Sequence, residues 1–330
     1  MITQQYVEYI RGIRRYSERT VSIYEGVLRD YVSFAFEGRE DVSDDELVRA
    51  MNKSEIRQYE VHMMESDPPH SPKTIALHMS AISSFCRFLM QKGMIRSNPV
   101  KLIPKPKVEK LLPHFFKKDA LDVYFDATKR LLEKKEYDAF LAEWNTDSGK
   151  KYYEDLLERL VISTLYTLGI RRSELISLRV GNVDFGRNIV KVHGKGDKMR
   201  EIPLMTSLSE EILLYLNAVE TMCEGERSLK EPLFVTYEGK PLYPMYVDRA
   251  VKSALGNVKG IRGRKSPHVL RHSLATELMN EGVNINSIKE LLGHSSLATT
   301  QVYTHSSIAR LKTIYERAHP RAKNGGKNGD

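Results

Sequence analysis

The sequence predicts a mainly α-helical protein with one small antiparallel β-hairpin, divided into two domains. Three observations lead to this prediction. The chain has 330 residues, more than a single hydrophobic core usually holds. Apolar residues recur at helical spacing along most of the chain, whereas one short stretch has two β-rich arms around a glycine-containing turn. Hydrophobic residues make up 41% and charged residues 28%, as in ordinary globular proteins.

Residues 1–105 are predicted to form a helical domain. In SERTVSIYEGVLRDYVSFAF, Ser17 is a plausible N-cap and the apolar residues follow at helical spacing. In SPKTIALHMSAISSFCRFLMQKG, Ser71 is the cap and a proline opens the helix. A further short helix is expected at about 44–64. A stretch rich in proline and lysine follows, and we assign residues 106–113 to an extended basic linker.

Residues 114–320 are predicted to form a second domain that combines helices with the hairpin. Residues 118–168 have helical patterning with a charged stretch in the middle. In residues 182–204, the arms IVKVH and MREIPL flank the turn GKGD, which is typical of a hairpin. Helices resume after it. The tail at residues 321–330, rich in Gly, Asn and Lys, is predicted to be disordered.

The charge of the chain is unevenly distributed. The net charge is +8, which suggests a polyanionic partner. Residues 1–100 contain 13 basic and 14 acidic residues, whereas residues 101–330 contain 38 and 29. If nucleic acid is the partner, the second part of the chain supplies most of the long-range attraction. Two cysteines, of which Cys86 lies in an apolar run, indicate neither a disulfide framework nor a thiolate metal site. No signal peptide or membrane-spanning stretch is recognisable, so we expect a cytoplasmic protein.

Two segments contain candidate anion-binding residues. In KSPHVLRHSLATELMNEG, Ser266 is the expected N-cap, and His268 and Arg271 share one face of the first helical turn. A helix start that presents a histidine and an arginine is suited to binding an anion. In LYTLGIRRSELISL, Gly169 ends one helix and Arg171 lies at the junction with the next. A planar guanidinium can donate two parallel hydrogen bonds to a phosphate. Taken singly, each residue could equally be a solvated surface group.

Three further residues are weak candidates on their own. Lys195 lies between two glycines in the hairpin turn, where a lysine is usually exposed but could also donate a proton. In GHSSLATTQVYTH, His294 and Tyr303 would lie on opposite sides of a continuous helix, so the chain must break to bring both to one site. We expect one helix to end at Gly293 and a serine, Ser295 or Ser296, to cap the next. His268 and His272 have the i, i+4 spacing of zinc ligands, but the H-E-x-x-H pattern is absent and we assign no metal.

Together these residues form a recognisable set. GIRRSEL, HGKGDKMREIP, HVLRHSLAT and LLGHSSLATTQVYTH follow one another in the order and spacing of the tyrosine recombinase, or phage integrase, family, which the chain resembles over nearly its whole length. The N-terminal part resembles the family's core-binding domain. The ending YTHSSIARLKTIYERAHPRA is most similar to the bacterial Xer branch, which resolves chromosome dimers.

The resemblance implies a role for each candidate. Tyr303 would attack the DNA backbone and form a 3′-phosphotyrosine that retains the energy of the broken bond. Arg171 and Arg271 would bind the non-bridging phosphate oxygens, and His294 would hydrogen-bond one of them. His268 would assist proton transfer at the tyrosine, and Lys195 would protonate the leaving 5′-oxygen. The cations replace a metal ion, so no cofactor is expected.

The resemblance also implies partners. The two domains would clamp a double-stranded DNA recombination site, and four protomers, identical or paralogous, would bind two sites. A cell-division DNA translocase is a further candidate partner. The helix expected after Tyr303 would dock in a neighbouring protomer, although the sequence allows docking on its own domain equally.

Three rival functions remain. The chain could be the integrase of a mobile element, with the same active site. It could be an architectural DNA-binding protein without catalysis, or a type IB topoisomerase.

The sequence departs from the family by a longer segment at about Lys134–Tyr152.

Overall fold

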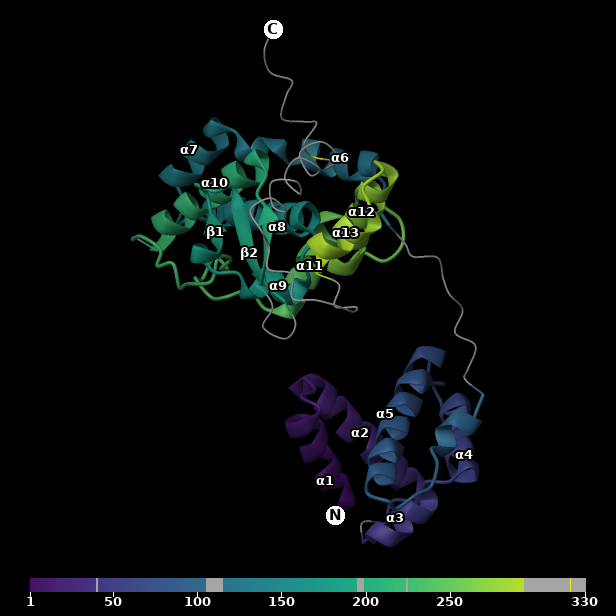
Figure 1. Cartoon of the computed structure of the whole chain (residues 1–330). Coiled ribbons are helices and arrows are strands. Elements are labelled where there is room, and N and C mark those ends of the chain that lie inside the picture. The colour runs from purple at the N-terminus through teal and green to yellow at the C-terminus, as the bar shows by residue number, and fades with distance from the viewer. Residues whose placement is uncertain (40, 105–114, 195–198, 224, 294–320, 322–330) are drawn as a thin grey trace. The chain divides into compact units, whose positions relative to one another are not determined.

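The computed structural model describes the chain except for residue 40 and residues 105–114, 195–198, 224, 294–320 and 322–330 (Figure 1). The chain divides into two compact units, Met1–Leu111 and Leu112–Asp330, and each unit has its own hydrophobic core. Among the described residues, no helix is both long and apolar enough to cross a membrane.

The first unit is helical throughout its described part. Its elements are α1 (Ile2–Glu8), a π-helical turn (Tyr9–Ile13), α2 (Glu18–Ala35), α3 (Asp44–Ala50), α4 (Lys53–Glu65), α5 (Pro72–Gln91) and a 3-10 turn (Pro99–Leu102). The predicted caps are confirmed, because the side chains of Ser17 and Ser71 accept hydrogen bonds from the backbone N–H groups of Thr20 and Thr74. Cys86 is buried in the core, and burial raises the pKa of its thiol to about 12.

The single helix predicted at 44–64 is wrong, since two helices occupy this stretch. α3 ends before Met51, whose φ of −75° and ψ of 56° leave the helical region. Asn52 is then the N-cap of α4, and its side chain accepts a hydrogen bond from the backbone N–H of Glu55. An asparagine that caps a new helix stabilises a break that apolar spacing alone does not reveal.

The second unit contains helices around a small sheet. Its elements are α6 (Lys118–Ala127), a 3-10 turn (Lys129–Leu132), α7 (Lys134–Ala142), α8 (Asp147–Leu168), α9 (Arg172–Ser177), a 3-10 turn (Val180–Asn182), β1 (Val183–Asp184), β2 (Ile189–His193), β3 (Met199–Pro203), α10 (Thr206–Cys223), α11 (Pro244–Ala254), α12 (Pro267–Asn280) and α13 (Ile285–Leu292). α8 is the central helix and packs against α10, α11 and α12 (Figure 1). The longer segment noted in the sequence forms α7 and the start of α8, where the Phe140 and Tyr152 rings stack 5.1 Å apart.

The predicted hairpin is present, with β2 and β3 paired antiparallel so that Val190 lies opposite Ile202. A third strand, β1, which the sequence did not predict, pairs with β2 at the edge of the sheet. The register places Val190, Val192 and Ile202 in the core. The hairpin is therefore fixed to the body of the unit, and its turn contains Lys195.

Gly169 ends α8 in the left-handed conformation, with φ +59°. A Cβ atom at this position would lie 2.7 Å from Cδ2 of both Leu274 and Leu292, which are buried in the core. The glycine thus allows the turn and also the close approach of α12 and α13 to the end of α8.

We predict that Gly169→Ala lowers the free energy of unfolding by about 2–4 kcal/mol, from left-handed strain together with overpacking. Gly239→Ala is the matched control, because Gly239 has φ +72° but a Cβ atom added to it would meet no other atom within 4 Å. It should cost only about 1 kcal/mol. Urea unfolding of the full chain measures both values, and equal losses would contradict the packing argument.

Candidate functional site

Arg171 is the N-cap residue of α9 and is held at both ends of its guanidinium group. One nitrogen donates to the Glu174 carboxylate at 2.7 Å, and the other donates to the Gly293 carbonyl at 2.9 Å. The backbone N–H of Arg171 donates to the second carboxylate oxygen at 2.8 Å. The junction after Gly169 therefore holds the Arg171 side chain in place and connects it to Gly293, the residue that precedes His294.

Arg271 lies in the first turns of α12 and is buried. Its guanidinium donates to the Gly169 carbonyl at 2.7 Å and to the Leu292 carbonyl. These two carbonyls end α8 and α13, so the positive charge faces the negative ends of two helix dipoles. Burial, followed by the charge of Arg171, lowers the pKa of Arg271 to about 10, and the side chain remains cationic at neutral pH.

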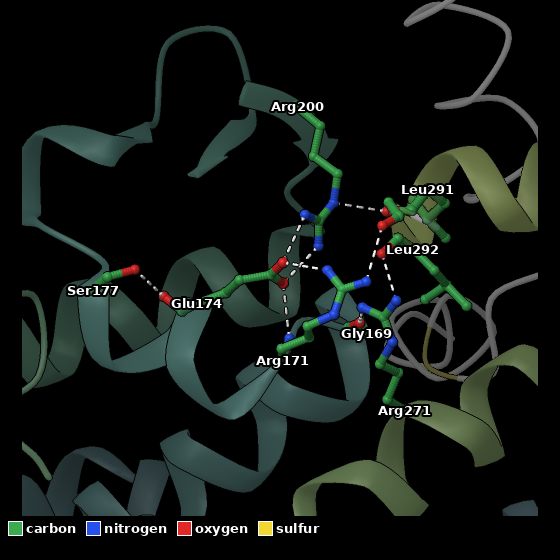
Figure 2. Close-up of polar contacts among 9 residues, drawn as sticks. Gly169, Arg171, Glu174, Ser177, Arg200, Arg271, Leu291 and Leu292 are labelled. Atoms are coloured by element: carbon green, nitrogen blue, oxygen red, sulfur yellow. Dashed lines mark hydrogen bonds and ion pairs between the residues drawn. The ribbon is translucent and has the colours of Figure 1, made fainter. Parts of the chain in front are cut away.

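A buried carboxylate, which the sequence analysis did not identify, joins the arginines. Figure 2 shows Glu174 between the guanidinium groups of Arg171 and Arg200. Arg200 on β3 donates to the two Glu174 oxygens at 3.1 and 2.8 Å and to the Leu291 carbonyl at 3.0 Å. Burial would raise the pKa of Glu174, but Arg200 and then Arg171 outweigh it and the pKa is lowered. Two features of the sequence could have indicated this pair: Glu174 is a glutamate in the first turn of α9, and Arg200 is an isolated arginine in a strand.

The resulting cluster has an excess of positive charge. Two arginines, Arg171 and Arg200, bind one carboxylate, and the charge of a third, Arg271, interacts electrostatically with all three groups. Arg171 and Arg271 each use two donors in bonds to the protein, while a guanidinium has five. The remaining donors and the net charge suit an oxyanion such as a phosphodiester.

His268 lies one turn before Arg271 on α12, with part of its ring exposed. Partial desolvation, followed by the charges of Arg271, Arg172 and Arg171, lowers the pKa of the imidazole. His268 is therefore neutral at physiological pH, which is the form that accepts a proton. Ser266 occupies the N-cap position, but its side chain makes no capping hydrogen bond, contrary to the prediction.

The structure brings together three of the six predicted residues, Arg171, His268 and Arg271. Lys195, His294 and Tyr303 lie outside the described residues. The residues that flank the two undescribed segments are described. α13 ends at Gly293 in the left-handed conformation, φ +66°, as predicted. Within the described ranges, no group of three or more His, Cys, Asp or Glu side chains could hold a metal ion.

We predict that Arg200→Lys lowers the free energy of unfolding by about 2 kcal/mol or more. A lysine keeps the charge but cannot form the two parallel bonds to Glu174 and the bond to α13. Arg187→Lys is the matched control, since Arg187 lies in the turn between β1 and β2 and is 44% exposed, and it pairs with Glu201 of β3 at 3.2 Å. That change should stay within about 0.5 kcal/mol. Denaturant unfolding distinguishes the two, and a neutral Arg200→Lys would contradict a structural role for the buried pair.

We also predict that His268 titrates below the ordinary histidine value of 6.5. Arg172→Gln removes a positive neighbour, so the imidazolium becomes less unfavourable and the pKa rises. Arg249→Gln is the control, because Arg249 is not among the charges that contribute most to the shift at His268, and it should leave the titration nearly unchanged. NMR titration of the histidine ring protons gives all three values. A His268 pKa at or above the ordinary value would contradict the electrostatic description.

Comparison with known proteins gives a consistent result. Residues 130–310 match the phage integrase family, and residues 3–93 match the phage integrase N-terminal SAM-like domain. The tyrosine recombinase XerC of Chlorobaculum parvum is 34% identical over 329 residues, covering 97% of this chain and 94% of the relative. The tyrosine recombinase XerD of Staphylococcus aureus is 32% identical, covering 97% and 99%.

Solved structures share the fold. The XerH site-specific recombinase bound to its difH substrate has a TM-score of 0.60 at 17% identity, covering 98% of this chain and 83% of that one. The Tn1549 transposon integrase in complex with transposon right-end DNA has a TM-score of 0.58 at 18% identity, covering 98% and 97%. The predicted fold class, mainly helical with a small antiparallel sheet, is confirmed. The chain belongs to the phage integrase family of tyrosine recombinases and is a site-specific DNA recombinase of Xer type.

Proposed function

We propose that the chain cuts and rejoins double-stranded DNA through a 3′-phosphotyrosine formed on Tyr303. The observation that carries this proposal is the arginine cluster, in which Arg171 binds the Gly293 carbonyl at 2.9 Å and Arg271 binds the adjacent Leu292 carbonyl. Two cations suited to a phosphate thus lie where the chain enters the segment that contains His294 and Tyr303.

The chemistry follows from the charges that the reaction creates. The Tyr303 oxygen attacks phosphorus, and the bond from phosphorus to the 5′-oxygen breaks. The tyrosine proton passes to His268, whose lowered pKa keeps it neutral before the step. Lys195 protonates the departing 5′-oxygen. A tyrosine with a pKa of about 10 is a weak nucleophile at neutral pH, so this assistance is needed.

Arg171 and Arg271 stabilise the pentacoordinate phosphorus. Negative charge grows on the non-bridging oxygens in the transition state, and donors fixed in advance need no reorganisation. His294 would add a hydrogen bond to one of these oxygens. Arg171, Arg271 and Lys195 supply the stabilisation that a metal ion supplies in other phosphoryl-transfer enzymes, and we propose that the chain uses no cofactor.

The biological role that we propose is resolution of chromosome dimers, as in the Xer branch, in the cytoplasm where the chromosome lies. Four protomers would act on two DNA sites, either as one protein or with a paralogous recombinase. A solved λ integrase tetramer is bound to a Holliday junction, and its chain shares this fold with a TM-score of 0.55. A cell-division DNA translocase would be a regulatory partner. The alternative role is integration of a mobile element.

The test is formation of a covalent adduct. Purified protein is incubated, without metal or ATP and with a chelator, with nicked duplex DNA from its own replication-terminus region. We expect an SDS-resistant protein–DNA adduct that is absent in Tyr303→Phe, because phenylalanine has no nucleophilic oxygen.

Tyr315→Phe is the matched control and should form the adduct as the wild type does. An adduct that persists in Tyr303→Phe would place the nucleophile elsewhere. Specific DNA binding without any adduct would favour the non-catalytic architectural function. Deletion of the gene then separates the two biological roles, since chromosome dimers accumulate only if the protein resolves them.

A further inference from the structure

A second set of buried charges lies apart from the arginine cluster of the candidate site. Arg159 of α8 and Glu211 of α10 form an ion pair at 3.0 Å, with both side chains almost fully buried. Arg321, near the end of the chain, donates to the same Glu211 oxygen at 2.7 Å and is 9% exposed. The residues on either side of Arg321 lie outside the described ranges.

Three helices contribute to the pocket that holds the Arg321 guanidinium. The Phe125 ring of α6 lies 4.2 Å from the guanidinium carbon, a favourable cation–π distance. Ser163 and Thr167 of α8 accept hydrogen bonds from one guanidinium nitrogen, and Glu211 accepts from the other. The pocket therefore provides an aromatic face, two hydroxyl groups and a carboxylate, which together select an arginine side chain.

Glu211 has a second cationic partner, although Arg321 lowers the pKa of this carboxylate more than Arg159 does. Arg159 already pairs with this carboxylate and also donates to the Phe125 carbonyl at 2.8 Å. With Arg321 present, the cluster contains two buried guanidinium groups and one carboxylate. Burying an additional charge is costly unless its partners are well placed. The partners of Arg321 are well placed, and they fix the position of this residue in the second unit.

The pocket is connected directly to the arginine cluster through α8. Arg159, Ser163 and Thr167 are four residues apart and share one face of this helix. Thr167 is two residues before Gly169, whose carbonyl binds Arg271, and four residues before Arg171. Residues 294–320 are preceded by Gly293, which Arg171 holds, and followed by Arg321. Gly293 is therefore held by Arg171, just beyond the C-terminal end of α8, and Arg321 is held by the C-terminal half of the same helix.

We propose that Arg321 is a positioning residue for DNA cleavage: its insertion between α6, α8 and α10 anchors the C-terminal side of the segment that contains Tyr303. The inference rests on the proposed function, in which Tyr303 is the nucleophile. Because effective concentration depends on restricting the reacting group, loss of one anchor reduces the fraction of time that the tyrosine oxygen is in line with phosphorus. The expected deficit is in the rate of cleavage and not in the affinity for DNA.

The test compares variants that remove the anchor with variants that remove only neighbouring residues. Arg321→Ala and a chain that ends at Pro320 lack the guanidinium. Lys323→Ala and a chain that ends at Lys323 retain it and lose similar charge or length. Single-turnover adduct formation at saturating nicked DNA should fall about tenfold or more in the first pair, while the second pair matches the wild type. The DNA dissociation constant should change by less than about twofold in all four.

Chemical rescue separates anchoring from simple filling of the pocket. Millimolar methylguanidinium added to Arg321→Ala can occupy the pocket and restore thermal stability, but it is not attached to the chain and should not restore the cleavage rate. Wild-type cleavage by Arg321→Ala would overturn the proposal, and so would recovery of stability and cleavage together. The wild type and Tyr303→Phe are measured in the same assay. If Tyr303 is not the nucleophile, this assay shows it in one of two ways. Either the wild type forms no adduct, or Tyr303→Phe forms the adduct as well.

Discussion

The arrangement of the second unit depends on the buried carboxylate of Glu174. This carboxylate offsets the repulsion between guanidinium groups that lie close together. Arg171 and Arg200 both bind this carboxylate, at 2.7 and 2.8 Å. Each arginine also binds a carbonyl at the end of α13. A carboxylate surrounded by cations stays ionised despite burial, and its lowered pKa reflects this. The guanidinium groups of Arg171 and Arg200 are therefore fixed in place by the protein itself.

Helix α8 connects the arginine cluster to the core of the second unit. It packs against α10, α11 and α12, ends in the left-handed turn at Gly169, and leads directly into Arg171. The same helix presents Ser163 and Thr167 to Arg321. A close-packed helix deforms little, so groups attached to it keep their spacing. Residues that are distant in sequence, such as Arg171 and Arg321, are thus held in a fixed relation to the same helix.

Local sequence signals predicted most of the features whose stabilising interaction is itself local, although the Ser266 side chain does not form the predicted cap. The caps at Ser17 and Ser71 and the turn at Gly293 each involve residues within a few positions of one another. Prediction failed where two local signals competed, as in the helix break at Asn52. It also missed β1, a two-residue strand whose existence depends on pairing with β2.

The sequence by itself determined the family and the fold class, because motif order and residue type do not depend on coordinates. Only the tertiary structure decided which groups hold those residues in place. Glu174 and Arg200 are 26 positions apart, and Glu211 and Arg321 are 110 apart. A carboxylate in a helix and an arginine in a strand or near a chain end are ordinary surface residues in sequence. These residues determine the structure only after the packing of α8 with its neighbours has buried them. In each pair, the buried carboxylate and the buried arginine then become partners.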